Sequence, residues 1–278
     1  MSVLYLDGQL VRAQDARVSA LDRGLLSGYG LFETLRAYGG KPWAFGDHYA
    51  RLRQGAELIA LDIPVAEVLA GAITDVLAAN DLGDAGVRVT VTGGVGPVDV
   101  QSDPDEPGSL IVIVWPVRDY TDLYEKGASL VTLPQGARPL AEVKTTSYAV
   151  SVAGRVFARR AGADDAVFLG GHKRVLEATG SNLFIASGDR LRTPPLDDAI
   201  LPGVTRSYVM DVARELGFAV DEEHVYIDDL IAADEVVLTS SLREVYPAAS
   251  VDGRALKRIG VADRLREAYA ALVRRTLG

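Results

Sequence analysis

The spacing of apolar residues changes period twice along the first half of the chain, and this limits its fold more than any other feature. From Leu31 to Tyr38 the side chains alternate with period two, as in a β-strand. Helical spacing follows Asp47 and again Pro64, and strand patterns return from Val87 to Thr92 and from Leu110 to Val114. With a short strand pair at the N-terminus, this half is predicted to be β-β-α-α-β-β, an α+β domain.

A polar, charged stretch separates this pattern from the rest of the chain. We expect a small N-terminal α+β domain over residues 1–118, a linker over 119–127 and a larger domain over 128–278. The second half mixes strands and helices, with helices predicted over 150–161, from about 203 to 216 and over 261–277.

Charge and composition narrow the partners. The 278 residues carry 29 Lys+Arg against 38 Asp+Glu, a net charge of −9, which disfavours nucleic acid and anionic membranes. The chain has no cysteine, and its three histidines lack metal-ligand spacing, so no metal site is predicted. The N-terminus lacks a signal-peptide core and the longest apolar run, Leu110 to Trp115, cannot span a bilayer, so we expect a cytoplasmic protein.

Four features stand out chemically. Lys144 lies among small polar residues, Glu177 precedes a Gly-Ser turn, and Leu201 to Arg206 enters a helix whose first amides suit an anion. Arg51, on the helix after Asp47, offers a two-pronged cation. Each feature has a simpler explanation when taken alone. Lys144 would be a loop lysine, Glu177 a surface glutamate, the 201–206 stretch an ordinary helix start, and Arg51 a solvated arginine.

Six ordered blocks that contain these features resemble the class IV (fold type IV) aminotransferases that use pyridoxal 5′-phosphate (PLP). The blocks are Asp22-Arg-Gly to Arg36, His48-Tyr-Ala-Arg51-Leu, Lys144, Glu177-Ala-Thr-Gly-Ser-Asn182-Leu-Phe184, Leu201-Pro-Gly-Val-Thr-Arg206, and Asp234-Glu235 through Ser241-Leu-Arg-Glu244-Val-Tyr-Pro247. The resemblance covers Val3 to Gly253 and implies a small α/β sandwich followed by a larger pseudo-barrel domain.

The resemblance also implies roles for single residues. Lys144 is similar to the lysine that forms the Schiff base with PLP and moves the proton between Cα and C4′, and Glu177 to the carboxylate on the pyridine nitrogen. The remaining implied cofactor contacts are the phosphate cup (Arg51, Val204, Thr205 and a hydroxyl of Ser240 or Ser241), the ring-face residue Leu201, and Tyr148 on the phenolic oxygen. For Tyr148, a core tyrosine is an equal alternative.

Departures from the family's patterns bear on the substrate. D-amino acid aminotransferases carry Arg and His after a proline in the substrate loop, where this chain has Val98 and Val100. Branched-chain enzymes carry Tyr and Arg where this chain has Ser27 and Val87. Neither known carboxylate contact is present, and a branched-chain function is disfavoured.

Other arginines are therefore candidates for the substrate carboxylate. In order, they are Arg88, which alternates away from the apolar face of its strand, then Arg243, then Arg36. Phe32, which shares its face with Arg36, is a further candidate for contact with the substrate. For each, a structural pair with Asp or Glu is the competing interpretation.

Two functions remain open at this point. The first is a transaminase exchanging amino groups between D-amino acids, extending to (R)-amines, and 2-keto acids, with a non-standard carboxylate contact. The alternative is 4-amino-4-deoxychorismate lyase, disfavoured by the Thr-Thr-Ser-Tyr run after Lys144. The resemblance further implies a homodimer in which the loop from Gly93 to Gly108 reaches the partner's pocket.

Overall fold

The chain begins with the hairpin that Asp7-Gly8 predicts, since both turn residues have positive φ (49° and 89°), as a tight hairpin turn requires. The structure, a computed structural model, describes residues 3–99, 107–134 and 139–278. By internal contacts it divides into a first unit, Met1–Arg118 with Val143–Tyr148, and a second unit, Asp119–Glu142 with Ala149–Gly278.

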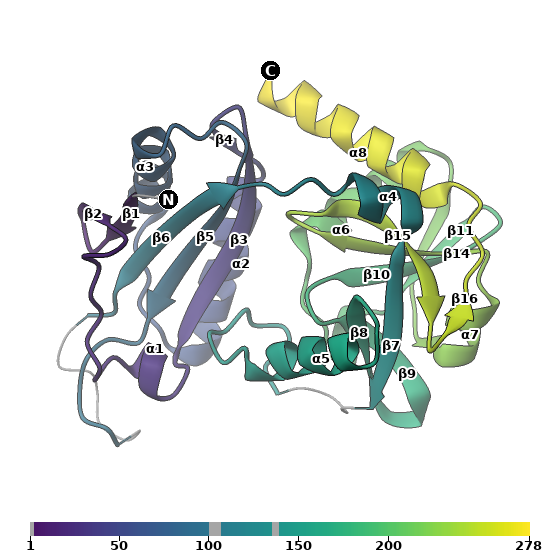
Figure 1. Ribbon diagram of the computed structural model, residues 1–278, viewed down its shortest axis with the longest axis horizontal. Helices are drawn as coiled ribbons and strands as arrows, with labels where there is room; N and C mark the ends of the chain where they lie inside the picture. Colours follow the sequence, from purple (N-terminus) through teal and green to yellow (C-terminus); the bar gives the residue numbers. More distant parts are fainter. Residues whose placement is uncertain (1–2, 100–106, 135–138) are drawn as a thin grey trace. The chain divides into compact units, whose positions relative to one another are not determined.

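The first unit is one antiparallel sheet with helices packed on one face (Figure 1). Its strand order is β2-β1-β6-β5-β3-β4. In chain order the elements are β1 (Val3–Leu6), β2 (Gln9–Arg12), α1 (Arg23–Leu26), β3 (Gly30–Tyr38), β4 (Lys41–Pro42), α2 (Phe45–Ile59), α3 (Ala66–Ala79), β5 (Ala85–Thr92) and β6 (Leu110–Pro116).

Period-two alternation puts the apolar residues of β3 and β5 on the helix side of this sheet. Leu31 and Leu35 join Val87 and Val89 in one core with residues of α2 and α3. Burying each such side chain stabilises the fold by about 1.5–3 kcal/mol. Helix α2 begins before Asp47, where the helical spacing was expected to start: Ala44 is its N-cap residue and Asp47 lies in its first turn.

The second unit contains a larger mixed sheet. Its strand order is β12-β11-β10-β14-β15-β7-β8-β9-β13, with β16 on β15. Its elements are α4 (Thr121–Lys126), β7 (Ala128–Pro134), α5 (Ala149–Arg160), β8 (Asp165–Leu169), η1 (Gly171–Lys173), β9 (Arg174–Ala178), β10 (Asn182–Ser187), β11 (Arg190–Thr193), η2 (Leu196–Asp198), α6 (Val204–Glu215), β12 (Ala219–Glu222), β13 (Val225–Tyr226), α7 (Ile227–Ala232), β14 (Glu235–Ser240), β15 (Glu244–Val251), β16 (Arg254–Ala255) and α8 (Val261–Leu277).

This sheet curls back on itself. Strands β9 and β10 are far apart in the sheet order, yet they are joined by a tight turn in which Ala178 bridges Ser181. One core links residues of β7, β8, β9, β10, β14 and β15, among them Leu130, Val167 and Tyr246. The predicted pseudo-barrel is therefore present, and Glu177 lies beside the turn that closes it.

Two expected boundaries differ in detail. The stretch 119–127, expected as a linker, contains the helix α4, whose residues belong to the second unit. Val143–Tyr148, which carries Lys144, packs with the first unit although the sequence placed it in the larger domain. The α+β class is confirmed. No helix in the described ranges has both the length and the apolar character needed to cross a membrane.

Candidate active site

The segment that carries Lys144 is held beside β3 by backbone hydrogen bonds. Phe32 N donates to Lys144 O at 2.9 Å, and Thr146 N donates to Gly30 O at 2.8 Å. Leu31 and Thr145 form an antiparallel bridge between these bonds. A stretch that looked like an irregular loop thus extends the sheet of the first unit, which fixes the backbone of Lys144.

The ring of Phe32 is the centre of a cationic cluster in the first unit. Lys144 Nζ lies 4.5 Å from the ring centroid, and the Arg88 guanidinium carbon lies 3.7 Å from it. Tyr148 packs edge-on against the same ring, at 5.3 Å between centroids. Cation–π contacts of this kind contribute about 0.5–2 kcal/mol. The ring brings together three sequence-predicted residues, Arg88, Lys144 and Tyr148.

Arg88 lies on the sheet face opposite the helices, as its strand position predicts. In the described part of the chain it forms no ion pair with Asp or Glu, and its hydrogen bond is a long one, from Nε to Thr90 Oγ1 at 3.4 Å. Burial lowers the pKa of Arg88, and Tyr148 opposes that shift. A half-buried guanidinium with this environment favours an anionic ligand.

Arg51 lies on the helix face of the same sheet, in a buried cluster with Glu33 and His48. Arg51 Nε and Nη2 donate to the two oxygens of Glu33 at 2.8 and 2.6 Å. His48, three residues earlier on α2, places Nδ1 2.8 Å from Glu33 Oε2. Because a carboxylate only accepts, Nδ1 carries the proton. The bidentate pair fixes the plane of the Arg51 guanidinium.

The electrostatics of this cluster follow from its burial. Burial alone would raise the pKa of Glu33, but the charge of Arg51, then that of His48 and hydrogen bonds from both, hold it well below its usual range. Burial lowers the pKa of His48; Glu33 opposes this, and the charges of Arg51 and Lys144 add to it. Glu33 and Arg51 are therefore an ion pair, with the His48 imidazole hydrogen-bonded to the same carboxylate.

In the second unit, Glu177 is a buried carboxylate on β9, 5% exposed. Its Oε2 accepts from Asn182 Nδ2 at 3.1 Å and from Leu201 N at 3.2 Å. Asn182 Nδ2 also donates to Leu201 O at 2.9 Å. The surface-turn interpretation of Glu177 is excluded by this burial, and Glu177 is tied to the entrance of α6.

The start of α6 presents backbone amides beside this carboxylate. Ser207 N makes the first intrahelical bond, to Gly203 O, so the amides of Val204 and Thr205, which precede this first donor, have no acceptor within the helix. A Cβ on Gly203 would come 1.9 Å from Asn182 Oδ1, so only glycine permits this approach. The helix start is thereby packed against Asn182.

The loop after β14 carries the remaining predicted cofactor residues. Ser240 and Ser241 are half-buried, and Ser240 Oγ accepts from Arg243 N at 3.4 Å. Thr239, which pairs with Asn182 across the ladder, is 1% exposed, and its Oγ1 has no hydrogen-bond partner within the described residues. An unpaired hydroxyl beside α6 and Asn182 is a position at which a bound polar group would be stabilised.

The sequence model of the class IV aminotransferases, described as "Amino-transferase class IV", matches residues 30–251 of this chain. The chain belongs to the class IV aminotransferase family. It is a PLP-dependent aminotransferase of fold type IV. Residues 30–251 include every predicted cofactor residue.

Individual relatives agree on the family and differ in substrate. A Methanocaldococcus jannaschii protein provisionally named branched-chain-amino-acid aminotransferase is 35% identical, covering 96% of this chain and 94% of that protein. The D-alanine aminotransferase of Bacillus licheniformis is 29% identical, covering 92% and 90%. The branched-chain aminotransferase of the archaeon Thermoproteus uzoniensis, solved with norvaline, superposes with a TM-score of 0.89 at 30% identity, covering 98% and 94%.

The residues present fit PLP. Glu177 is a buried carboxylate of the type that holds a protonated pyridine nitrogen, and the α6 amides with the Ser240-Ser241 hydroxyls form a donor set for a phosphate. Thr239 offers an unpaired hydroxyl on the same part of the second unit, within the described residues. Lys144, with its backbone fixed, would supply the amine.

Sequence reasoning missed Glu33, Asn182 and Thr239. Glu33 and Asn182 stand inside the blocks that carried the resemblance, but neither residue was given a role. An acid on the apolar side of β3 was a signal that Glu33 needs a buried cationic partner.

Two further predicted features remain. Arg36, the third candidate for the substrate carboxylate, is half-buried, and its guanidinium carbon lies 4.7 Å from the ring centroid of Tyr38. Part of the Gly93–Gly108 loop, including Val100, lies outside the described residues.

One group of side chains has metal-ligand proximity that the sequence did not predict. Asp197, Asp198 and His224 place one ligand atom each within 4.8 Å of one another. Asp198 is already engaged in ion pairs, with Arg174 at 2.6 Å and His224 at 2.8 Å. These contacts account for the group as a structural cluster.

Proposed function

We propose that this enzyme transfers amino groups between D-amino acids and 2-keto acids, with (R)-amines as further donors, and that Arg88 binds the substrate carboxylate. The observation that supports this most is the shared Phe32 ring, with Lys144 Nζ at 4.5 Å and the Arg88 guanidinium at 3.7 Å. A reactive amine and an arginine without an acidic partner among the described residues meet at one side chain. An amino acid substrate supplies a carboxylate for the Arg88 guanidinium and a Cα for the Lys144 amine.

When bound, PLP withdraws electrons from the Cα of an attached amino acid, so that its proton can be removed. In the proposed mechanism Lys144 would hold the cofactor and would act as the base that moves the Cα proton. Glu177 would keep the ring nitrogen protonated by its negative charge. Leu201 would pack on the ring, and Tyr148 would donate to the phenolic oxygen.

The phosphate is assigned to the α6 amides of Val204 and Thr205, a hydroxyl of Ser240 or Ser241, and Arg51. The dipole of a twelve-residue helix and its unpaired first amides favour a dianion at this end. Arg51 contributes through an edge of a guanidinium that Glu33 holds in one plane. The hydroxyl adds a neutral donor.

Departures at single positions support the D-amino acid assignment. Ser27 and Val87 replace the Tyr and Arg that branched-chain enzymes carry, and the Ser241-Leu242-Arg243 turn replaces their Thr-Ala-Ala turn.

A second candidate function is transamination of branched-chain L-amino acids, which the 35% identity to the Methanocaldococcus jannaschii protein favours. The lyase activity on aminodeoxychorismate is the third.

A half-reaction screen separates these candidates. The PLP form is mixed with D- and L-alanine, D- and L-leucine, (R)-1-phenylethylamine and aminodeoxychorismate, and the change in cofactor absorbance is followed. Faster conversion by the D-amino acids supports the proposal. Preference for L-leucine replaces it with the branched-chain function, and release of pyruvate with aminobenzoate replaces it with the lyase.

We also propose that the enzyme works as a homodimer in the cytoplasm, on small-molecule substrates and without nucleic acid or membrane partners. Exposed apolar side chains gather around α1, where Leu21, Leu25 and Leu26 are 50%, 68% and 46% exposed. Such a cluster favours a protein interface. Sedimentation of the purified protein at one monomer mass would overturn the dimer.

A further inference from the structure

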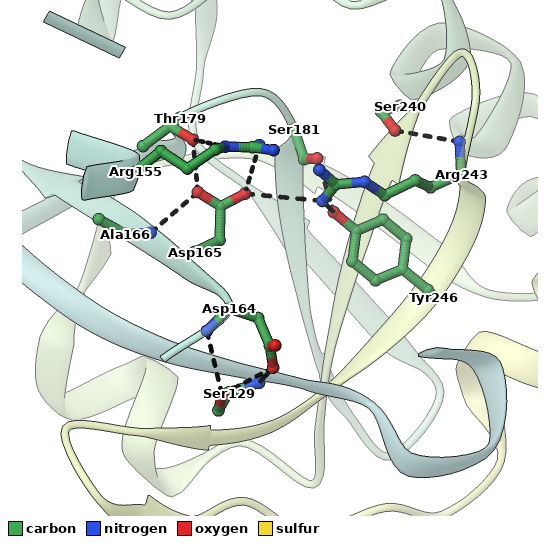
Figure 2. A network of polar contacts seen from close by, with 10 residues as sticks. All are labelled: Ser129, Arg155, Asp164, Asp165, Ala166, Thr179, Ser181, Ser240, Arg243 and Tyr246. Atoms are coloured by element: carbon green, nitrogen blue, oxygen red, sulfur yellow. Dashed lines mark hydrogen bonds and ion pairs between the residues drawn. The ribbon is translucent and has the colours of Figure 1, made fainter. Parts of the chain in front are cut away.

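Asp165, at the start of β8, is a buried carboxylate that joins several elements of the second unit (Figure 2). Its side chain is 1% exposed. Oδ2 accepts from Arg155 Nη2 at 3.2 Å and lies 3.7 Å from Arg243 Nη1. Oδ1 accepts from Ala166 N at 2.9 Å and from the Thr179 hydroxyl. Both oxygens are therefore engaged, and two arginines share one carboxylate.

The network continues from Arg243 through Tyr246 to Ser181. Arg243 Nη1 donates to Tyr246 Oη at 3.1 Å, and Tyr246 Oη lies 2.7 Å from Ser181 Oγ, where either oxygen can donate. Burial raises the pKa of Tyr246, and the opposing charge of Arg243 does not reverse this, so the phenol is neutral. Figure 2 shows the Arg243 guanidinium against the hydroxyl of Tyr246.

The contacts of Asp165 and Tyr246 hold the two ends of the turn between β9 and β10, at Thr179 and Ser181. Thr179 and Ser181 stand on either side of Gly180, and Ala178 N donates to Ser181 O at 2.9 Å. Glu177 precedes the turn and Asn182 follows it, with a hydrogen bond between their side chains. Any shift of the turn therefore moves the Glu177 carboxylate.

The same arginine also belongs to the loop that carries the serines. Arg243 N donates to Ser240 Oγ, while its side chain reaches Asp165 and Tyr246. One residue thus connects the Ser240-Ser241 loop to the Glu177 turn. Burial would lower the pKa of Arg243, but Tyr246 and Asp165 outweigh it and the pKa is raised, as for a guanidinium whose charge is already compensated.

We propose that Arg243 and Asp165 are positioning residues that set the spacing between two parts of the cofactor site. One part is the Glu177 carboxylate, assigned to the ring nitrogen, and the other is the pair of Ser240 and Ser241 hydroxyls, assigned to the phosphate. This rests on the proposed function, in which the two sites hold opposite ends of one cofactor. It assigns Arg243 to cofactor alignment instead of the substrate carboxylate. A ligand that spans both ends senses this spacing, and a ligand that occupies one end does not.

Arg243→Met tests the proposal, with pyridoxamine 5′-phosphate and inorganic phosphate as probes of the cofactor-free enzyme. We expect the Kd for pyridoxamine 5′-phosphate to rise by about 10- to 100-fold, as it does when outer hydrogen bonds are removed around bound metals. The Kd for phosphate alone should change by less than about threefold, since the α6 amides and serines remain. Arg243→Lys should recover part of the loss.

Arg190→Met is the matched control, because Arg190 is an exposed arginine on β11 of the same unit whose ion pairs lie with Asp221 and Glu223. It should alter neither Kd. Equal weakening of both probes by Arg243→Met would overturn the spacing role, because it would show a local phosphate contact. An unchanged Kd for pyridoxamine 5′-phosphate with a KM for amino acids raised about 100-fold would overturn it in favour of substrate binding.

Tyr246→Phe provides a second variant should Arg243→Met fold poorly, since it keeps the buried ring and removes only the hydroxyl between Arg243 and Ser181. It should weaken pyridoxamine 5′-phosphate binding without affecting phosphate; an unchanged ratio of the two Kd values contradicts the proposal. Failure of the wild-type protein to bind pyridoxamine 5′-phosphate would overturn the proposed function itself, a result distinct from either variant outcome.

Discussion

The two units each contain a buried carboxylate bound to arginine, and the arginines are distributed differently. In the first unit Glu33 takes Arg51 in a bidentate pair, and Arg88 lies apart on the other face of the sheet, over Phe32. In the second unit Asp165 takes both Arg155 and Arg243. The pKa of Arg88 is lowered by burial, and that of Arg243 is raised by its partners despite burial.

This difference separates Arg243, a positioning arginine, from Arg88, the candidate for binding the substrate carboxylate. A guanidinium whose charge is compensated by a buried carboxylate loses that interaction if it turns toward a ligand. A guanidinium held over a ring, with no acid nearby among the described residues, gains when an anion arrives. Two arginines that sequence alone ranked side by side thus receive opposite roles.

Replacing Lys144 with Ala tests whether the chemistry belongs to the Phe32 cluster. Turnover should fall by about 10,000-fold or more, because both the covalent attachment and the proton transfer are lost. Binding of pyridoxamine 5′-phosphate should persist, since its assigned contacts in the second unit are intact. Steady-state kinetics and a binding titration measure the two, and retained turnover would refute the assignment of Lys144.

Removing the carboxylate from the Glu33 cluster and from the Asp165 cluster compares how much each contributes to the free energy of unfolding. Glu33→Ala leaves Arg51, with 8% of its side chain exposed, buried without the Glu33 carboxylate, and should lower the free energy of unfolding by about 3–5 kcal/mol. Asp165→Ala should cost less, because Arg155 and Arg243 are 38% and 23% exposed and reach water. Urea titrations give both values. Equal losses would mean that exposure of the arginines does not matter.

Arg88→Met addresses the arginine that has no acidic partner among the described residues. The kcat/KM for D-alanine should fall by about 100- to 1000-fold, as expected when one partner of a charged hydrogen-bonded pair is removed. With (R)-1-phenylethylamine, which has no carboxylate, kcat/KM should hardly change. Arg36→Met serves as the control on the same sheet face. An equal loss with both donors would show that Arg88 is structural.

The smallest effect concerns His48 and pH. Burial places the folded-state pKa of His48 below its usual value of 6.5, so the unfolded chain takes up the proton first as pH falls. The contribution to stability is fully present above 6.5 and is lost progressively as pH falls from that value toward the lower folded-state pKa. Between about pH 7.5 and about pH 5.5, His48→Gln should lose less stability than the wild type. An unchanged slope in urea titrations would contradict this; His172→Asn, at an exposed site, is the control.

The sequence by itself determined the architecture and the family. Period-two strands and amphipathic helices predict β3, α2, α3, β5 and β6 because the local alternation of side chains does not depend on distant residues. Ordered motifs located Lys144, Glu177 and the start of α6. The turn Asp7-Gly8 was readable for the same local reason.

Only the tertiary structure decided which charged residues meet. Glu33 and Arg51 are 18 residues apart, and Asp165 and Arg243 meet through strands that are not consecutive in the chain. Ion pairing depends on which strands become neighbours, and strand order in a curled sheet is a global property. The sequence could therefore propose both Arg88 and Arg243 for the substrate carboxylate. The tertiary structure distinguishes them, because Arg243 lies beside the Asp165 carboxylate and Arg88 lies over the ring of Phe32.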